Sequence, residues 1–334
     1  MMKTIGFQIT VLLVSAFTAL CCESGGRDRY LTSLRVTPEI LVPIDSINME
    51  TWGIYSSSSL IKRGDWFLTR NSKGDCNVSA FNPNSGEILH FLPYGRATGE
   101  ISMKGRLNEA GGVVSIHDFG TNTVVALNVE ASLRQKEQIL DTISRFTESM
   151  PYVNPLSCKS GFIATSFKNA KVWYVLIDPT AQEISSVNAI GEELLRNEED
   201  PAMSMVNSVI TVSPDGDKIC CAAMDLMALS FSSIENGLLI EKKRFEMPRA
   251  SDSKPVSNFI GIFSDNDRVY VLYSGQTFSS SKNEANWLLV YNWDGKPLKC
   301  YNLARSAFSL AVEGNTVYCT TDYPDSKIFV YQLD

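Results

Sequence analysis

The chain has 334 residues, 44% of them hydrophobic and 20% charged, and its 30 Lys and Arg residues against 37 Asp and Glu residues give a formal net charge of -7. This balance is that of a globular protein and excludes intrinsic disorder and collagen-like structure. The acidic excess argues against a nucleic-acid-binding protein, which needs basic surface to meet phosphates. Two histidines leave little room for histidine-based metal or acid–base chemistry.

The N-terminal residues 1–21 have the pattern of an export signal. Lys3 supplies a positive start, and Ile5–Leu20 is a mostly apolar run that is too short and too interrupted to span a bilayer. The run stops at a cysteine and resembles a bacterial lipoprotein signal, in which the thiol takes a diacylglyceryl group and becomes the new N-terminus. We therefore predict lipidation at Cys21. Lipidation at Cys22 and an ordinary cleaved signal without a lipid are the alternatives.

The residues after the signal set the expected location and domain organisation. Residues 22–29 form a short polar spacer, and residues 30–334 are predicted to be a single domain. A lipid at the N-terminus would hold this domain at a membrane surface. We expect an exported protein of the bacterial cell envelope, anchored in the outer membrane and facing either the periplasm or the cell surface. Contact with the membrane would be through the anchor only.

Strand-like runs separated by Gly, Asn, Asp and Ser turns dominate the rest of the chain. One run rich in Val, Leu and Tyr recurs as Val78–Asn82, Val124–Asn128, Tyr174–Asp178, Met227–Ser232, Leu288–Asn292 and Ile328–Gln332. A run that precedes it recurs as Trp66–Arg70, Gly112–His117, Gly161–Ser166, Lys218–Ala223, Arg268–Tyr273 and Thr316–Thr320. The strongest helical patterns are Ala131–Ile143 and Ile190–Asn197.

A four-stranded unit that repeats every 40 to 60 residues or so is typical of a β-propeller. We predict an all-β, six-bladed propeller, with two stacked sandwiches or separate domains as the alternative. The chain ends directly after a third strand, so Tyr30–Pro43 is predicted to complete the last blade and close the ring, which leaves no open sheet edge there. The strands expected to line the axis are Trp52–Tyr55, Lys104–Asn108, Pro155–Cys158, Ser208–Ser213, Phe259–Phe263 and Ala307–Val312.

Two local motifs point to a known family. Ser213–Ile219 resembles the Ser-Pro-Asp-Gly-x-x-Ile hairpin of TolB-type blades, in which a tight Asp-Gly turn joins two strands. Tyr94–Glu100 is similar to the Gly-x-Gly-Pro-Gly-Glu stretch of the TolB-like six-bladed propeller lipoproteins of Bacteroidetes. Gly95, Gly99 and Glu100 match that stretch, and Ala97-Thr98 stands where the family has Gly-Pro. The resemblance implies a fold and a location but no activity, because the family is uncharacterised.

No catalytic motif is present: there is no nucleophile elbow, Walker A loop or dinucleotide fingerprint. The six cysteines after the signal form no C-x-x-C pair and are expected to be mostly small buried side chains; a disulfide or two remains open. We predict no cofactor and no metal. The candidate ligand-binding residues are the polar ones expected at the channel mouth, although Asp and His at strand ends also serve as turn caps: Arg96, Glu100, Arg106, His117, Asp118 and Asp322.

The sequence favours a noncatalytic role. Surface loops tolerate insertions and often carry binding sites. The long connections are expected on one face of the propeller. They are Pro93–Met103, Asp141–Asn154, Asn188–Asn207, Phe245–Ser257 and Ser274–Asn286. We predict a monomeric envelope lipoprotein whose loop-rich face binds a protein or glycan partner. A metal-assisted hydrolase or lyase acting at the mouth of the channel and a purely structural role in an envelope assembly are the alternatives.

Overall fold

The computed structural model describes residues 27–334 apart from residues 56, 58, 71–73, 104, 147–151, 167–171, 189–206, 225, 248–255, 278–284 and 322–324. The chain divides into two compact units, Met1–Thr37 and Pro38–Asp334. The described part of the first unit contains the short helix α2 (Arg27–Ser33). All described strands belong to the second unit.

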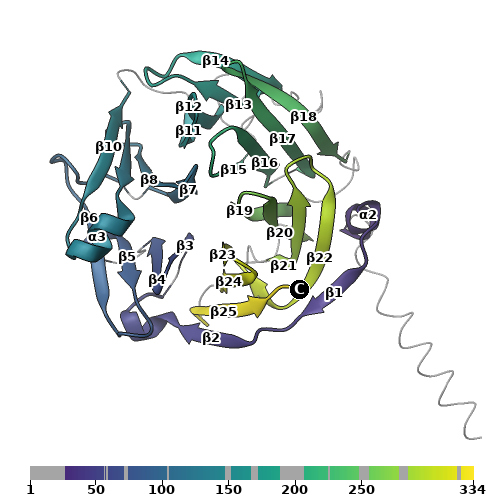
Figure 1. Ribbon diagram of the computed structural model, residues 1–334, viewed down its shortest axis with the longest axis horizontal. Helices are drawn as coiled ribbons and strands as arrows, with labels where there is room; N and C mark the ends of the chain where they lie inside the picture. The colour runs from purple at the N-terminus through teal and green to yellow at the C-terminus, as the bar shows by residue number, and fades with distance from the viewer. Residues whose placement is uncertain are drawn as a thin grey trace, which may run out of the picture. The chain divides into compact units, whose positions relative to one another are not determined.

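Six sheets follow one another around a ring in the second unit (Figure 1). Blade 1 consists of β3 (Leu60–Arg63), β4 (Trp66–Arg70), β5 (Cys76–Phe81) and β6 (Ile88–Pro93), and blade 2 of β7 (Leu107–Ala110), β8 (Val113–Asp118), β9 (Thr123–Leu127) and β10 (Leu140–Arg145). Blade 3 consists of β11 (Tyr152–Cys158), β12 (Gly161–Ser166), β13 (Val172–Ile177) and β14 (Glu183–Asn188), and blade 4 of β15 (Ser208–Val212), β16 (Lys218–Ala223), β17 (Ala228–Glu235) and β18 (Leu238–Glu246).

The last two blades recruit strands from the start of the second unit. Blade 5 consists of β19 (Val256–Ser264), β20 (Arg268–Thr277), β21 (Ala285–Asn292), β22 (Pro297–Ala307) and β1 (Pro38–Leu41), and blade 6 of β23 (Ser309–Glu313), β24 (Thr316–Thr320), β25 (Lys327–Gln332) and β2 (Asp45–Asn48). The predicted all-β, six-bladed propeller is confirmed, and an N-terminal strand completes the last blade as predicted.

The closing strand lies later in the sequence than the predicted segment Tyr30–Pro43. It is β2, which pairs antiparallel with β25 and is framed by hydrogen bonds from the Ile44 N–H to Val330 O (2.8 Å) and from the Met49 N–H to Ser326 O (2.9 Å). β1 instead pairs parallel with β22 at the outer edge of blade 5. The two strands also differ in packing: Ile47 of β2 packs against the cluster next to blade 1, whereas β1 buries Leu41 in the cluster between blades 5 and 6 and leaves Ile40 79% exposed.

The apolar core lies between adjacent blades rather than within them. At the seam where the chain closes, residues from blade 1 and blade 6 share one cluster: Met49, Ile54, Leu60, Phe67, Phe81, Ala311 and Ile328. Comparable clusters join blades 1 and 2, 3 and 4, and 5 and 6. Each sheet therefore buries its faces only against its neighbours, so that closure of the ring completes the core.

Two element predictions are corrected by the structure. The helix predicted over Ala131–Ile143 ends early: α3 covers Val129–Gln135, Lys136 takes a left-handed conformation (φ 59°), and Leu140–Arg145 is the outer strand of blade 2. The first inner strand is β3 and not Trp52–Tyr55, because Trp52 ends a short 3-10 helix, η1 (Met49–Trp52). The predicted helix Ile190–Asn197 lies outside the described residues.

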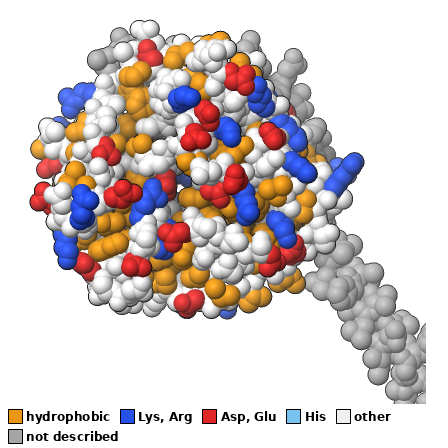
Figure 2. All heavy atoms as spheres, in the orientation of Figure 1, with side chains coloured by type: hydrophobic (Ala, Val, Ile, Leu, Met, Phe, Trp, Pro, Cys, Tyr) orange, Lys and Arg blue, Asp and Glu red, His pale blue; other side chains and the backbone are white. Residues whose placement is uncertain are grey.

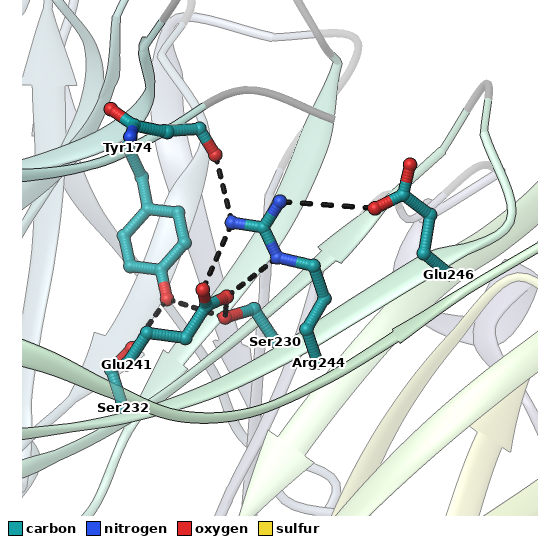
Figure 3. Close-up of polar contacts among 7 residues, drawn as sticks. Tyr174, Ser230, Ser232, Glu241, Arg244 and Glu246 are labelled. Carbon is teal, nitrogen blue, oxygen red and sulfur yellow. Dashed lines mark hydrogen bonds and ion pairs between the residues drawn. The ribbon is translucent and has the colours of Figure 1, made fainter. Parts of the chain in front are cut away.

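A polar network also links blades 3 and 4 (Figure 3). The Tyr174 hydroxyl of β13 is within hydrogen-bonding distance of the Ser230 and Ser232 hydroxyls of β17 (2.8 and 2.6 Å), and Ser230 donates to Glu241. Arg244 binds Glu241 through Nε (2.8 Å) and donates to the Asn188 carbonyl of β14 (2.9 Å). The Glu241 carboxylate thereby accepts from the Ser230 hydroxyl, which is buried, and is paired in turn with the Arg244 guanidinium.

The antiparallel order of strands divides the connections between two ends of the ring. We call the end with the first-to-second and third-to-fourth connections of each blade the hairpin face; it carries turns such as 64–65, 111–112, 178–182 and 293–296. We call the opposite end the loop face; it carries the second-to-third connections, such as 119–122, and described parts of the links between blades, such as 94–103. The described strand ends that flank the predicted long connections therefore lie at one face.

Candidate binding site at the central channel

The inner strands surround a cavity of about 110 Å³ on the axis of the ring. Its walls come from β3, β7, β15, β19 and β23 and the residues next to them, and its polar lining consists of Ser59, Arg106, Asn108, Glu109, Thr211, Ser264 and Ser309. A space of this size holds on the order of ten water molecules. It therefore has room for one small polar group and not for a large ligand.

Arg106 enters the channel at the loop-face end of β7, and Gly105 determines where it does so. A Cβ atom on Gly105 would lie 2.4 Å from Ile116 Cγ2 and 2.6 Å from the His117 carbonyl oxygen. Only glycine permits this approach of the connecting segment to β8. The next residue is thereby held against blade 2 and lines the cavity.

The guanidinium of Arg106 has no ion pair or hydrogen bond to the residues that the structure describes. Burial lowers the pKa of this guanidinium, and the nearby positive charge of Arg70 lowers it further. Arg70 ends β4 of the neighbouring blade, also at the loop face. Because an arginine side chain stays protonated in proteins, the loop-face end of the channel carries a half-buried positive charge.

The hairpin-face end of the same strand carries the opposite charge. Glu109 of β7 forms an ion pair with Arg63 of β3 (2.5 Å), so that the two inner strands are joined across a blade boundary. The second oxygen of Glu109, Oε2, is buried and has no hydrogen-bond partner among the described residues. The cavity is therefore polarised, with a guanidinium near one end and a carboxylate near the other.

His117 and Asp118 lie together at the loop-face end of β8. The imidazole is buried and packs against Phe119, with ring centroids 4.3 Å apart. Burial lowers the pKa of His117, and the Asn122 side chain and the Asp118 carboxylate oppose this shift only in part. A neutral imidazole in this position is held by packing.

The Asp118 carboxylate accepts four hydrogen bonds from the protein itself. The donors are the Ser102 N–H and hydroxyl (2.8 and 2.7 Å), the Gly120 N–H (3.0 Å) and the Thr121 hydroxyl (2.7 Å). Burial alone would raise the pKa of Asp118, but these hydrogen bonds outweigh it and the pKa is lowered. The carboxylate thus ties the link between blades 1 and 2 to the end of β8.

Arg96 and Glu100 lie in that same link, within a compact turn. Glu100 Oε2 accepts a hydrogen bond from the Ala97 N–H (2.8 Å), and its carboxylate lies over Gly95, where a Cβ would be 1.9 Å away. Arg96 is exposed. The Glu100 N–H in turn donates to the Ala97 carbonyl (3.0 Å). The two side chains flank the loop face of blade 2 but do not line the cavity.

The structure therefore places Arg96, Glu100, Arg106, His117 and Asp118 along the loop-face side of blade 2, and of these only Arg106 lines the channel. Asp322 lies outside the described residues, as do Cys21 and Cys22. Sequence reasoning missed Arg70 and Glu109. An arginine that ends the mostly apolar run Trp66–Arg70 was the available signal for Arg70. The pairing of Glu109 with Arg63 depends on a neighbouring blade and has no local signature.

Two exposed apolar side chains border this site on the loop face. Met103 is 56% exposed and Phe119 is 46% exposed. Met103 lies beside Gly120, the residue that follows Phe119, because a Cβ on Gly120 would be 3.1 Å from Met103 Cγ. We call the two exposed side chains the Met103–Phe119 patch. The face of the molecule shown in Figure 2 carries charged side chains of both signs, interspersed without an extended field of one sign.

Comparisons with known proteins identify no family. No model of a known family matches this chain, and no curated protein is significantly similar to it. The similar solved structures include BamB from Moraxella catarrhalis, at 10% identity and a TM-score of 0.41, with 88% of this chain and 100% of that chain covered. A protein from Lactobacillus plantarum is 12% identical, with a TM-score of 0.46 and coverage of 83% and 81%. The blade count and the ring closure rest on the strand pairing of the chain itself.

Within the described parts of the chain, no helix is long and apolar enough to cross a membrane. In the same parts, no three His, Cys, Asp or Glu side chains come together in a way that could hold a metal ion. The cysteines Cys76, Cys158, Cys220, Cys221, Cys300 and Cys319 are all free thiols. Burial raises the pKa of Cys319 to about 12, as expected for a small side chain in the core.

Proposed function

We propose that the protein is a noncatalytic, lipid-anchored protein of the cell envelope that acts as a monomer and binds a protein or glycan partner through its loop face. The observation that carries the proposal is the Met103–Phe119 patch beside the loop-face end of the channel. Methionine and aromatic residues are enriched in the contact regions of protein interfaces. A cluster of such side chains at the surface, rimmed by polar residues, commonly marks a binding site.

The two faces of the ring differ in a way that supports this choice of surface. On the hairpin face, turn side chains bind the backbone of their own turns: Asp178 Oδ1 accepts from the Thr180 and Gln182 N–H groups, and Asn292 Oδ1 accepts from the Lys296 N–H. These turns are short and self-contained. The loop face carries the longer connections, where binding residues are most often found.

Partner capture tests the proposal. Full-length protein with an affinity tag is incubated with envelope extract, and the retained material is identified by mass spectrometry. We expect the double variant Met103→Ser/Phe119→Ser to lose most of the retained partner. Leu238→Ser is the matched control, because Leu238 is 47% exposed and begins β18 at the hairpin face. Equal capture by the two variants would contradict the proposal. Prior digestion of the extract with protease or glycosidases separates a protein from a glycan.

A further inference from the structure

The unpaired guanidinium of Arg106 is a feature that folding alone does not explain. Desolvating a charge is unfavourable unless it is paired, and buried charges in proteins are ordinarily paired for this reason. Arg106 lines the cavity, yet its guanidinium contacts no acceptor among the described residues, and the nearby Arg70 repels it. A site of this kind is stabilised when an anion enters.

The other groups in the channel define which anion fits. The carboxylate of Glu109 is engaged by Arg63 at the hairpin-face end, so it does not neutralise Arg106. The planar fork of a guanidinium matches the two oxygens of a carboxylate. The cavity of about 110 Å³ has room for a carboxylate on a short aliphatic stem. Ser59 and Asn108, which also line it, can hydrogen-bond to such a group.

We propose that the channel binds a single carboxylate, supplied by an acidic side chain of the protein partner, and that Arg106 pairs with it. The inference rests on the proposed function and names the chemical group that anchors the partner. A protein side chain is favoured over a uronic acid because an extended stem enters a narrow channel by its end, whereas a sugar ring must bring its full width. The adjacent Met103–Phe119 patch would then contact the apolar residues that flank the acidic one.

The test uses the full-length protein and two carboxylate probes, sodium acetate and a hexaglutamate peptide, at constant ionic strength. Binding is measured by calorimetry and by the rise in Tm that ligands of the native state produce. We expect both probes to bind, and Arg106→Gln to weaken binding by about tenfold or more. Arg145→Gln is the charge-matched control, because Arg145 is exposed at the end of β10. Arg106→Lys keeps the charge without the fork and should bind with intermediate affinity.

A second readout separates a ligand-binding arginine from a structural one. Without any carboxylate, Arg106→Gln should have a higher Tm than the wild type, because it removes a half-buried charge that has no partner among the described residues and lies near Arg70. A lower Tm in Arg106→Gln, or the same response to acetate in wild type and Arg106→Gln, would overturn the proposal. Stronger binding of sodium phosphate or of glucuronate than of hexaglutamate would overturn the assignment to an acidic side chain.

Failure of this inference is distinguishable from failure of the proposed function. If Arg106→Gln still captures the partner from envelope extract and the wild type does not bind acetate, the carboxylate site is wrong while the binding role of the loop face stands. If the wild type binds hexaglutamate through Arg106 but captures no partner, the carboxylate site stands and the proposed function is wrong.

Discussion

Arg106 depends on its neighbours at the loop-face end of blade 2 for its position. Gly105 packs against the carbonyl of His117, and Asp118 binds the Ser102 backbone, so the link between blades 1 and 2 is held at these two residues. The guanidinium itself forms no hydrogen bond or ion pair with the described residues that hold this arrangement. A charged side chain that is positioned by others and paired with none is the pattern expected of a binding residue.

Substituting Gly105 tests how tightly this segment is held. Gly105→Ala would push a Cβ into Ile116 and the His117 carbonyl, and overpacking of this kind destabilises proteins by about 1–3 kcal/mol. We expect that loss in the free energy of unfolding, measured in urea, together with weakened acetate binding. Gly314→Ala is the control for introducing a Cβ, since nothing lies within 4 Å of that position, although its φ of 61° adds some strain. A Gly105→Ala variant no less stable than Gly314→Ala would contradict this reading.

His117 should make the stability of the protein sensitive to acid. Burial lowers its pKa in the folded chain, so below about pH 6.5 the unfolded chain takes up a proton that the folded chain does not. The free energy of unfolding should therefore fall as the pH drops from 7 towards 5. His117→Phe keeps an aromatic ring against Phe119 and should lose this part of the pH dependence. His90→Phe is the composition control and should retain it; a flat profile in wild type would refute the assignment.

At the scale of elements, the ring is held by contacts between blades of two kinds. Apolar clusters fill the interfaces, and a few polar links fix the alignment of neighbouring sheets, as Arg63 with Glu109 does between β3 and β7. The network of Tyr174, Glu241 and Arg244 is the larger of these two examples and lies between blades 3 and 4. The Arg244 guanidinium also lies 5.7 Å from the centre of the Trp173 ring.

Removing Glu241 should show what the network contributes. Glu241→Ala leaves a partly buried Arg244 and the Ser230 hydroxyl without their shared acceptor, which should cost about 2 kcal/mol in the free energy of unfolding. Glu235→Ala on the adjacent strand is the control. Glu235 pairs with Lys242 at the surface, with side-chain exposures of 51% and 45%, so its loss should have little effect. Equal effects of the two substitutions in urea unfolding would show that the network is dispensable.

At the scale of the whole molecule, stability depends on the seam where β2 joins β25. The seam cluster contains Met49, which is fully buried, together with residues that lie at the other end of the second unit, such as Ile328. Local contacts can form early in folding, but this cluster forms only when the two ends meet. Closure is therefore a long-range step, which is entropically demanding.

Met49→Ala should weaken the ring as a unit. Truncating a buried methionine costs about 2–5 kcal/mol because a cavity remains, and we expect this loss in the free energy of unfolding, measured in urea by fluorescence. Leu238→Ala, at an exposed position outside the cluster, should change stability by less than about 0.5 kcal/mol. If Met49→Ala unfolds at the same urea concentration as wild type, the seam does not limit stability.

The sequence by itself determined the all-β class, the six blades and the existence of an N-terminal closing strand. The all-β class follows from local alternation of apolar residues. The blade count follows from repetition along the chain, which a single recurring strand pattern reveals. The end of α3 and the strand Leu140–Arg145 were missed, because pairing with β9 outweighs the helical pattern of the same residues. A local sequence pattern does not show which sheet edge is available for a segment to pair with, as the edge at β9 is for Leu140–Arg145.

Only the tertiary structure decided which segment closes the ring and which polar residues meet. β1 and β2 have similar lengths, and they differ in the cluster that their apolar side chains meet: Ile47 packs against the seam cluster, whereas Leu41 of β1 joins the cluster between blades 5 and 6. Likewise, Arg70 and Arg106 come from different blades, and Glu109 forms its ion pair with Arg63 of β3. Charges separated along the chain interact only through the fold, so the unpaired state of Arg106 could not be found without it.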